Sequence, residues 1–173
     1  DLVLNHSAKE HEWAEKAKKG DEKYQNYYWM FDTDETPKQY EQSLVEVFPA
    51  HAPGNFTYYP KIKKWVWTTF NEHQWDLNWS NPDVFLEIVD IMLNLANKGA
   101  DVLRLDAVAF MWKRLGTRCQ SEPEVHVILR ALRAACRIAF PSVLHLEEAI
   151  VAPAEMLPYL GRGGHDGKEG NLA

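Results

Sequence analysis

Long apolar runs are absent from the 173-residue sequence, and no segment approaches the roughly 20 residues that a membrane-spanning helix needs. A block of basic residues is also missing, and the formal net charge is -6. Proteins that bind nucleic acids normally present such a block to the phosphate backbone. We therefore expect neither a membrane nor a nucleic acid as a partner, and a neutral or polar small substrate fits the composition better.

Cysteines and recognisable ligand motifs are scarce as well. Cys119 and Cys136 lack the CxxC spacing of metal and redox sites, so we interpret both as ordinary thiols. No HExxH spacing occurs, which argues against a metal-dependent hydrolase that would use His6, His145 and the glutamates as ligands. No GxGxxG follows a strand-like segment, so the usual reason to expect a dinucleotide is missing. The sequence predicts no metal and no cofactor.

What is present is a globular composition, with 46% hydrophobic residues, arranged in strand-like and helix-like segments. Residues 2–5 are typical of a strand, and Ser7 with Glu10 forms a capping-box pattern for a helix over residues 8–19. Residues 31–60 look irregular and are interpreted as an insertion. We expect further helices over residues 23–28, 82–98, 123–139 and 153–159, and strands over residues 65–70, 101–107 and 143–150.

The alternation of strands with long helices is typical of a parallel sheet with helical crossovers, either an open sheet or a barrel. Such sheets bind ligands beyond the carboxyl ends of their strands. Polar residues gather at these ends of the expected strands: Asn5 and His6, Arg104 and Asp106, and Glu147 and Glu148. Because burying charges without a partner is costly, the pattern indicates a functional site.

Arg104 and Asp106 lie two residues apart in an expected strand and therefore share one face. By themselves they could form a structural ion pair. With a carboxylate from the neighbouring strand, they have the equipment of a retaining glycosidase, in which one carboxylate attacks the anomeric carbon and the other protonates the leaving oxygen. Arg104 would keep Asp106 ionised, while Glu148, with no adjacent cation, would stay protonated. Alternation puts Glu147 and Glu148 on opposite faces without telling which one points inward.

Several segments together resemble the α-amylase superfamily of glycoside hydrolases: DLVLNH, WVWTTFNEHQWDLNWSNPDVF, DVLRLDAVAF and LEEAIV. Within this superfamily, NHSAKEHEWAEKAKKGDEKYQNYYWMF, EVFPAHAPGNFT and AVAFMWKRLGTRCQ are similar to amylosucrases and the related sucrose hydrolases. The resemblance covers nearly the whole chain and is weakest in residues 33–44 and 58–64. Its specificity comes from the several segments together rather than from any single motif.

The resemblance implies an α/β fold, namely a partial (β/α)8 TIM barrel from about strand 3 to the start of strand 6. Residues 1–6 would be strand 3, and residues 7–78 would be a small domain inserted after it. Residues 79–173 would supply the barrel from helix 3 through strand 5 and the following, truncated helix. We therefore expect an internal fragment of a larger protein, which alone is inactive because the family's third catalytic carboxylate would follow Ala173.

The resemblance also assigns roles to residues. It makes Asp106 the nucleophile and Glu148, rather than Glu147, the acid and base. The residues that would contact the donor glucosyl ring are His6, Phe70, Gln74 and Arg104. From the residues alone, Phe70 could equally be core packing, and a single histidine near a strand end is more often a loop residue.

The activity implied by the resemblance is that of a retaining glucosyltransferase with sucrose and an α-glucan acceptor as its partners. Such an enzyme cleaves sucrose through a covalent glucosyl-enzyme intermediate, releases fructose and passes the glucose to the glucan. A sucrose hydrolase, or another α-glucosidase of the superfamily, is the alternative, because it uses the same two carboxylates with a different acceptor. A non-catalytic amylase-like ancillary subunit is an alternative of another class, but such a protein should have lost Asp106 and Glu148.

Overall fold

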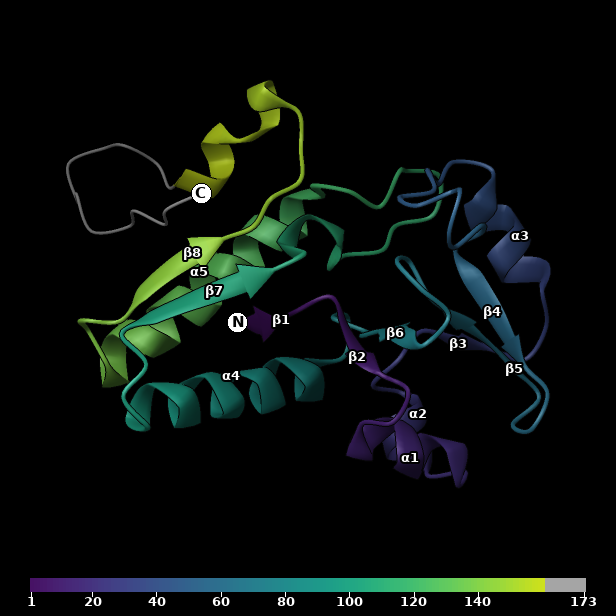
Figure 1. Cartoon of the computed structure of the whole chain (residues 1–173), viewed down its shortest axis with the longest axis horizontal. Coiled ribbons are helices and arrows are strands. Elements are labelled where there is room, and N and C mark those ends of the chain that lie inside the picture. Colours follow the sequence, from purple (N-terminus) through teal and green to yellow (C-terminus); the bar gives the residue numbers. More distant parts are fainter. Residues whose placement is uncertain (161–173) are drawn as a thin grey trace. The chain divides into compact units, whose positions relative to one another are not determined.

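The chain folds into two compact units, each made of segments that are not continuous in sequence. The computed structural model describes residues 1–160 (Figure 1). Unit 1 contains Asp1–Leu4, Phe85–Trp112 and the residues from Gln120 onward, and unit 2 contains Asn5–Val84 and Lys113–Cys119. The predicted limits of the inserted domain, residues 7–78, stay a prediction. The expected start of a sixth barrel strand lies outside the described residues.

Unit 1 is built on a parallel sheet of three strands in the order β1-β7-β8. These strands are β1 (Leu2–Val3), β7 (Val102–Asp106) and β8 (Leu144–Glu147). Arg104 lies opposite Leu146, and Leu105 lies opposite Glu147, so β7 and β8 run side by side with their carboxyl ends together (Figure 1). The expected α/β arrangement is confirmed, whereas the strands within residues 1–160 do not close a barrel.

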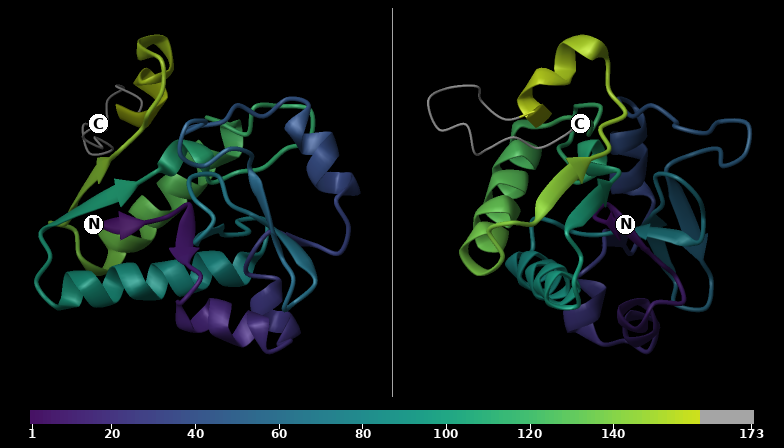
Figure 2. Two further views of the ribbon diagram at one scale, coloured as in Figure 1. Left: turned by 45° about the vertical axis from the view of Figure 1, so that its right-hand side comes forward. Right: turned by 60° about the vertical axis from the view of Figure 1, so that its left-hand side comes forward.

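Two long helices make the crossovers of unit 1: α4 (Pro82–Asn97) before β7, and α5 (Pro123–Ala139) between β7 and β8. Proline is favoured at a first helical position because its missing N–H is not needed there. Gly99, with a φ of 97°, follows α4 in the left-handed region that ends many helices. Both helices match the predicted ranges closely, and α5 runs beside β7 and β8 in the turned views (Figure 2).

Short 3-10 turns complete unit 1. The turn η1 (Val108–Phe110) follows β7 directly, and Ala107 between them has a left-handed φ of 55°. The helix expected over residues 153–159 is wrong, since this stretch forms the separate turns η2 (Pro153–Glu155) and η3 (Leu157–Leu160). A proline inside an α-helix removes a hydrogen bond and clashes with the preceding turn, and Pro158 stands at that place.

Unit 2 contains two small antiparallel sheets and three short helices. One sheet pairs β2 (His6–Ala8) with β6 (Gln74–Asp76), and the other has the order β3-β5-β4. The remaining elements are β3 (Met30–Phe31), β4 (Phe56–Tyr59), β5 (Lys64–Trp67), α1 (Glu12–Lys18), α2 (Glu22–Gln25) and α3 (Glu35–Glu41). Residues 31–60 were expected to be irregular, but they contain α3 and β4. Tyr40 of α3 and Phe56 of β4 pack against Trp67 of β5 in a cluster that also contains Cys119.

The first helix begins later than its capping pattern predicts. Residue Ser7 lies in β2, opposite Trp75, and its hydroxyl is 2.6 Å from the Tyr28 hydroxyl. The N-cap of α1 is instead His11, whose Nδ1 accepts a hydrogen bond from the backbone N–H of Trp13 at 3.3 Å. The capping box of Ser7 and Glu10 is therefore wrong, because strand pairing with β6 takes this segment before a helix can start.

Candidate active site

The carboxyl end of β7 presents an arginine and an aspartate on one face. Side-chain exposure is 35% for Arg104 and 25% for Asp106. Leu105, which lies between them in the sequence, and Leu103, which precedes Arg104, are buried. The alternation predicted from the sequence is thus confirmed. One face of β7 is packed and the other carries the charged pair, with Arg104 Nη1 lying 2.9 Å from Asp106 Oδ1.

The neighbouring strand adds a second carboxylate to this pair. Glu148 follows β8 directly, and its backbone N–H donates to the Leu105 carbonyl at 2.9 Å, which keeps it in register with β7. Its Oε1 lies 2.7 Å from Arg104 Nη2. A single guanidinium therefore holds both Asp106 and Glu148, and it also lies 3.3 Å from an oxygen of Asp1. The expectation that Glu148 has no adjacent cation is wrong.

The electrostatics of the pair favour a proton on Glu148 despite this cation. The pKa of Glu148 is raised, first by its hydrogen bond with Asp106, then by burial and by the negative charge of Asp106. The charge of Arg104 acts in the opposite direction and does not cancel these effects. A raised pKa keeps Glu148 protonated to a higher pH than an ordinary glutamate, which is the property required of a general acid.

The adjacent Glu147 lies on the other face of β8. Its side chain is buried together with His145, at 2% and 0% exposure. Among residues 1–160, neither ring nitrogen of His145 has a hydrogen-bond partner. Burial, with a smaller contribution from the charge of Arg133, lowers the pKa of His145 to about 4. Glu147 is therefore separated from Arg104 and Asp106 by the strand itself, and Glu148 is the glutamate that meets them.

The other three predicted residues form a cluster of their own in unit 2. His6 at the start of β2 and Gln74 at the start of β6 belong to paired strands, and Gln74 Nε2 lies 2.9 Å from His6 Nε2. The ring of Phe70 lies 5.3 Å from the imidazole of His6, in a tilted arrangement. The predicted site residues are thus brought together as two groups, one in each unit: Arg104, Asp106 and Glu148, and His6, Phe70 and Gln74.

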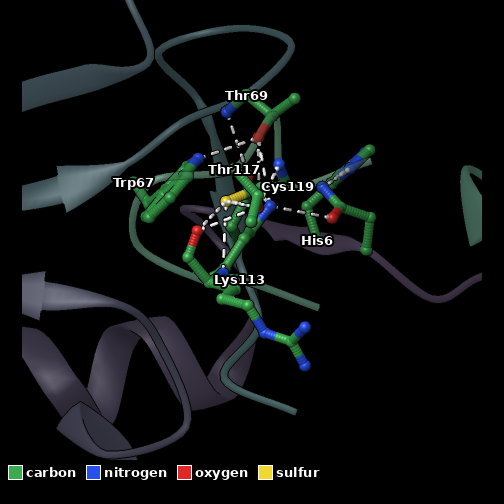
Figure 3. A network of polar contacts seen from close by, with 9 residues as sticks. His6, Trp67, Thr69, Lys113, Thr117 and Cys119 are labelled. Carbon is green, nitrogen blue, oxygen red and sulfur yellow. Dashed lines mark hydrogen bonds and ion pairs between the residues drawn. The ribbon is translucent and has the colours of Figure 1, made fainter. Parts of the chain in front are cut away.

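Next to the group of His6, Phe70 and Gln74 in unit 2 lies a buried ion pair that no sequence pattern predicted. Lys113 Nζ lies 2.6 Å from Asp76 Oδ2, and the two side chains are 1% and 0% exposed. Figure 3 shows the polar network around this lysine, which includes Thr69. The only signal in the sequence is a lysine directly after the apolar stretch AVAFMW, a pattern that is equally typical of a lysine facing solvent.

Neither a metal cluster nor a membrane span is found in the described part of the chain. Within residues 1–160, no group of three or more His, Cys, Asp or Glu side chains is arranged to hold a metal ion. No helix in the same range is both long and apolar enough to cross a membrane. Cys119 and Cys136 are buried free thiols, as predicted.

Comparison with known proteins identifies the family of the chain. The profile of the family described as "Alpha amylase, catalytic domain" matches residues 1–169. The chain belongs to the α-amylase family. Among curated α-amylase-family relatives, glucosylglycerate phosphorylase of Spirochaeta thermophila is 36% identical over 93% of this chain and 27% of its own length. Trehalose synthase of Thermus thermophilus is 35% identical over 94% of this chain and 17% of its own length.

Solved structures agree on the fold. Isomaltulose synthase from Protaminobacter rubrum superposes with a TM-score of 0.80 at 22% identity, over 99% of this chain and 32% of that protein. The trehalose-6-phosphate hydrolase of Bacillus licheniformis gives a TM-score of 0.79 at 21% identity, over 99% of this chain and 31% of that protein. The chain thus shares the fold of these proteins and spans about 30% of their length, and it spans less than a third of the length of the curated relatives. The predicted superfamily is confirmed, and the narrower amylosucrase assignment stays a proposal.

Proposed function

We propose that the complete protein is a retaining enzyme that cleaves an α-glucosidic bond through a covalent glucosyl-enzyme intermediate. The observation that carries this proposal is the guanidinium shared by both carboxylates, with Arg104 2.9 Å from Asp106 and 2.7 Å from Glu148. An inverting enzyme needs carboxyl groups about 6.5 to 9.5 Å apart to leave room for a water between them. The carboxyl groups of Glu148 and Asp106 are hydrogen-bonded to each other as well as to Arg104, which leaves no such room and favours the covalent route.

In the first step, a carboxylate oxygen of Asp106 attacks the anomeric carbon and forms an ester bond to the glucosyl group. The bond from this carbon to the leaving oxygen breaks, and Glu148 delivers its proton to that oxygen. The raised pKa of Glu148 supports its role as the proton donor. Arg104 contacts Asp106 directly, with Nη1 2.9 Å from Oδ1, and is placed to hold the attacking carboxylate in position.

In the second step, Glu148 is ionised and takes the proton of an acceptor hydroxyl. The acceptor oxygen attacks the anomeric carbon, the ester bond to Asp106 breaks, and the configuration of the glucosyl carbon is retained. Phe70 would offer a flat apolar face to the glucosyl ring, while His6 and Gln74 would bind its hydroxyl groups. The contact of His6 with both Phe70 and Gln74 supports this grouping.

The donor and the acceptor form the narrower part of the proposal. Sucrose as the donor and an α-glucan as the acceptor follow from the resemblance to amylosucrases. The names of the relatives support the broader alternative, an α-amylase-superfamily enzyme acting on another α-glucoside, because those proteins are a glucosylglycerate phosphorylase and a trehalose synthase. In the proposed mechanism, such activities would share the glucosyl-enzyme and would differ in the leaving group and in the molecule that takes the glucosyl group.

A substrate panel tests the proposal. The complete protein is incubated with sucrose, with trehalose and with glucosylglycerate plus phosphate, and the anomeric configuration of the first product is followed by proton NMR. We expect one of these donors to be consumed with an α-configured first product. The isolated 173-residue chain is the control, and it should be inactive. A β-configured first product would show inversion and contradict the covalent route, while release of fructose with formation of glucan would establish the narrower assignment.

A further inference from the structure

Lys113 carries a charge that is almost completely removed from water. Its side chain is 1% exposed, and it belongs to Lys113–Cys119, the segment of unit 2 that follows η1 of unit 1 along the chain. Burying an ammonium group costs several kcal/mol unless it is paired and hydrogen-bonded. The partners that offset this cost therefore show what the lysine holds together.

Three side-chain oxygens surround the ammonium group of Lys113 (Figure 3). They are Asp76 Oδ2 at 2.6 Å, Thr69 Oγ1 at 3.3 Å and Asn5 Oδ1 at 3.4 Å. Asp76 also accepts hydrogen bonds from the backbone N–H of Thr69 at 3.0 Å and from its hydroxyl at 2.6 Å. The ring of Trp67 covers the ammonium at 4.7 Å, so the charge is held on several sides.

Each of these oxygens comes from a segment that carries one of the proposed glucosyl-contacting residues. Asn5 directly precedes His6, and Thr69 directly precedes Phe70. Asp76 stands at the end of β6, the strand that begins with Gln74, and it is the register partner of His6. A single ammonium group thus joins three separate stretches of chain at the positions next to the proposed sugar contacts.

We propose that Lys113 is a positioning residue of the proposed active site, whose ammonium group keeps His6, Phe70 and Gln74 in the arrangement that binds a glucosyl ring. This inference rests on the proposed function and adds to it a residue that acts through its neighbours. Displacing a substrate-positioning group by about 1 Å can cost about 100-fold in rate. A lysine beneath the site can therefore control turnover through the placement of the sugar ring.

The test uses the complete protein with Lys113→Met combined with Asp76→Asn. Lys113→Met alone leaves a buried carboxylate without a cation and can prevent folding, whereas the second change removes that charge and keeps an amide oxygen for Thr69. We expect the unfolding midpoint of the double variant to stay near that of the wild type. Its kcat/KM for 4-nitrophenyl α-D-glucopyranoside should fall about 10- to 100-fold. The matched control is Lys64→Met with Asp32→Asn at an outer ion pair of unit 2 with the same 2.6 Å separation, which should leave kcat/KM unchanged.

A double-mutant cycle separates positioning from a purely structural role. In a background with His6→Ala and Gln74→Ala, the same double change should cost less than about threefold in kcat/KM, since residues that act through one another are not additive. If the losses multiply in full, or if Lys113→Met with Asp76→Asn keeps wild-type kcat/KM, Lys113 has no positioning role.

Calorimetric binding of 1-deoxynojirimycin, an iminosugar with the shape of glucose, separates this inference from the proposed function. If the wild type binds the iminosugar but turns over no α-glucoside, the proposed function fails, and weaker binding by the double variant still supports the role of Lys113. Equal binding by the wild type and the double variant overturns the positioning role. A wild-type protein that neither binds the iminosugar nor turns over an α-glucoside overturns both proposals.

Discussion

The two charged clusters of this chain use a cation in opposite ways. In unit 1, Arg104 is one third exposed and is shared among the carboxylates of Asp1, Asp106 and Glu148. In unit 2, Lys113 is 1% exposed and is paired with one carboxylate, that of Asp76. The first cluster has more negative groups than positive ones, so a proton can move without breaking the fold. The second has matched charges sealed from water, so any change of charge there acts on the structure itself.

The largest expected effect is a loss of turnover when the proposed nucleophile of the exposed cluster is replaced. Asp106→Asn keeps the shape of the side chain but removes the attacking carboxylate, and we expect kcat/KM for an α-glucoside to fall by about 10³-fold or more. The unfolding midpoint should change little, because the side chain is partly exposed. Steady-state kinetics of the complete protein provide the measurement. Unchanged turnover would mean that Asp106 is not the nucleophile.

The same kind of change in the buried cluster should act on stability instead. Lys113→Met leaves Asp76 buried without its cation, and breaking a buried pair in this way typically costs about 3 to 5 kcal/mol. Denaturant unfolding of the complete protein would measure this loss. Lys64→Met at the outer pair with Asp32 should cost less than about 1 kcal/mol. If both variants lost the same free energy of unfolding, burial of the Lys113–Asp76 pair would not make it more important for stability than the outer pair.

The buried face of β8 offers a test through pH. The pKa of His145 falls to about 4 in the folded protein. The unfolded chain, with a pKa of about 6.5, binds the proton more tightly, so stability is fully present above that pH and is lost as the pH falls towards 4.

His145→Leu should remove this loss, which amounts to up to about 3 kcal/mol. The free energy of unfolding at pH 7 and pH 4.5 would show a smaller difference in the variant than in the wild type. The control is His51→Leu, because His51 is exposed. An unchanged pH dependence in His145→Leu would mean that the imidazole has the same pKa in the folded protein as in the unfolded chain.

The smallest expected effect is a shift in the pKa of Glu148 in the exposed cluster. Because Asp106 raises the pKa of Glu148 and Arg104 lowers it, Asp106→Asn should move this pKa down and Arg104→Met should move it up. Carbon NMR titration of the Glu148 carboxyl group would follow both shifts. If the pKa of Glu148 moved in the same direction in both variants, Arg104 would not be the cation that lowers it.

Much of this site could be predicted from the sequence because period-2 alternation is a strong signal. The two-residue spacing of Arg104 and Asp106 is enough to predict that they share one face of β7. Alternation cannot choose between Glu147 and Glu148, because it distinguishes the two faces of a strand without saying which face is packed. The burial of His145 and Glu147 supplies that missing information.

Other features depend on contacts between distant segments and left no local pattern. The capping signal at Ser7 was overridden by the pairing of β2 with β6, which lies far along the chain. Lys113 resembles any lysine after an apolar run until Asn5, Thr69 and Asp76 are brought around it. Local propensity predicts such places poorly, because tertiary contacts decide them.

The interleaving of the two units has a practical consequence for cutting or grafting this chain. An excised piece that ends at Val84 would leave Asp76 behind without Lys113, which enters unit 2 only through the later segment Lys113–Cys119. A piece of unit 1 that begins at Phe85 would likewise lack β1, the neighbour of β7 in its sheet. Domain exchange with a relative should therefore transfer Lys113–Cys119 together with Asn5–Val84. Exchanging Asn5–Val84 alone would take Asp76 from one protein and Lys113 from the other.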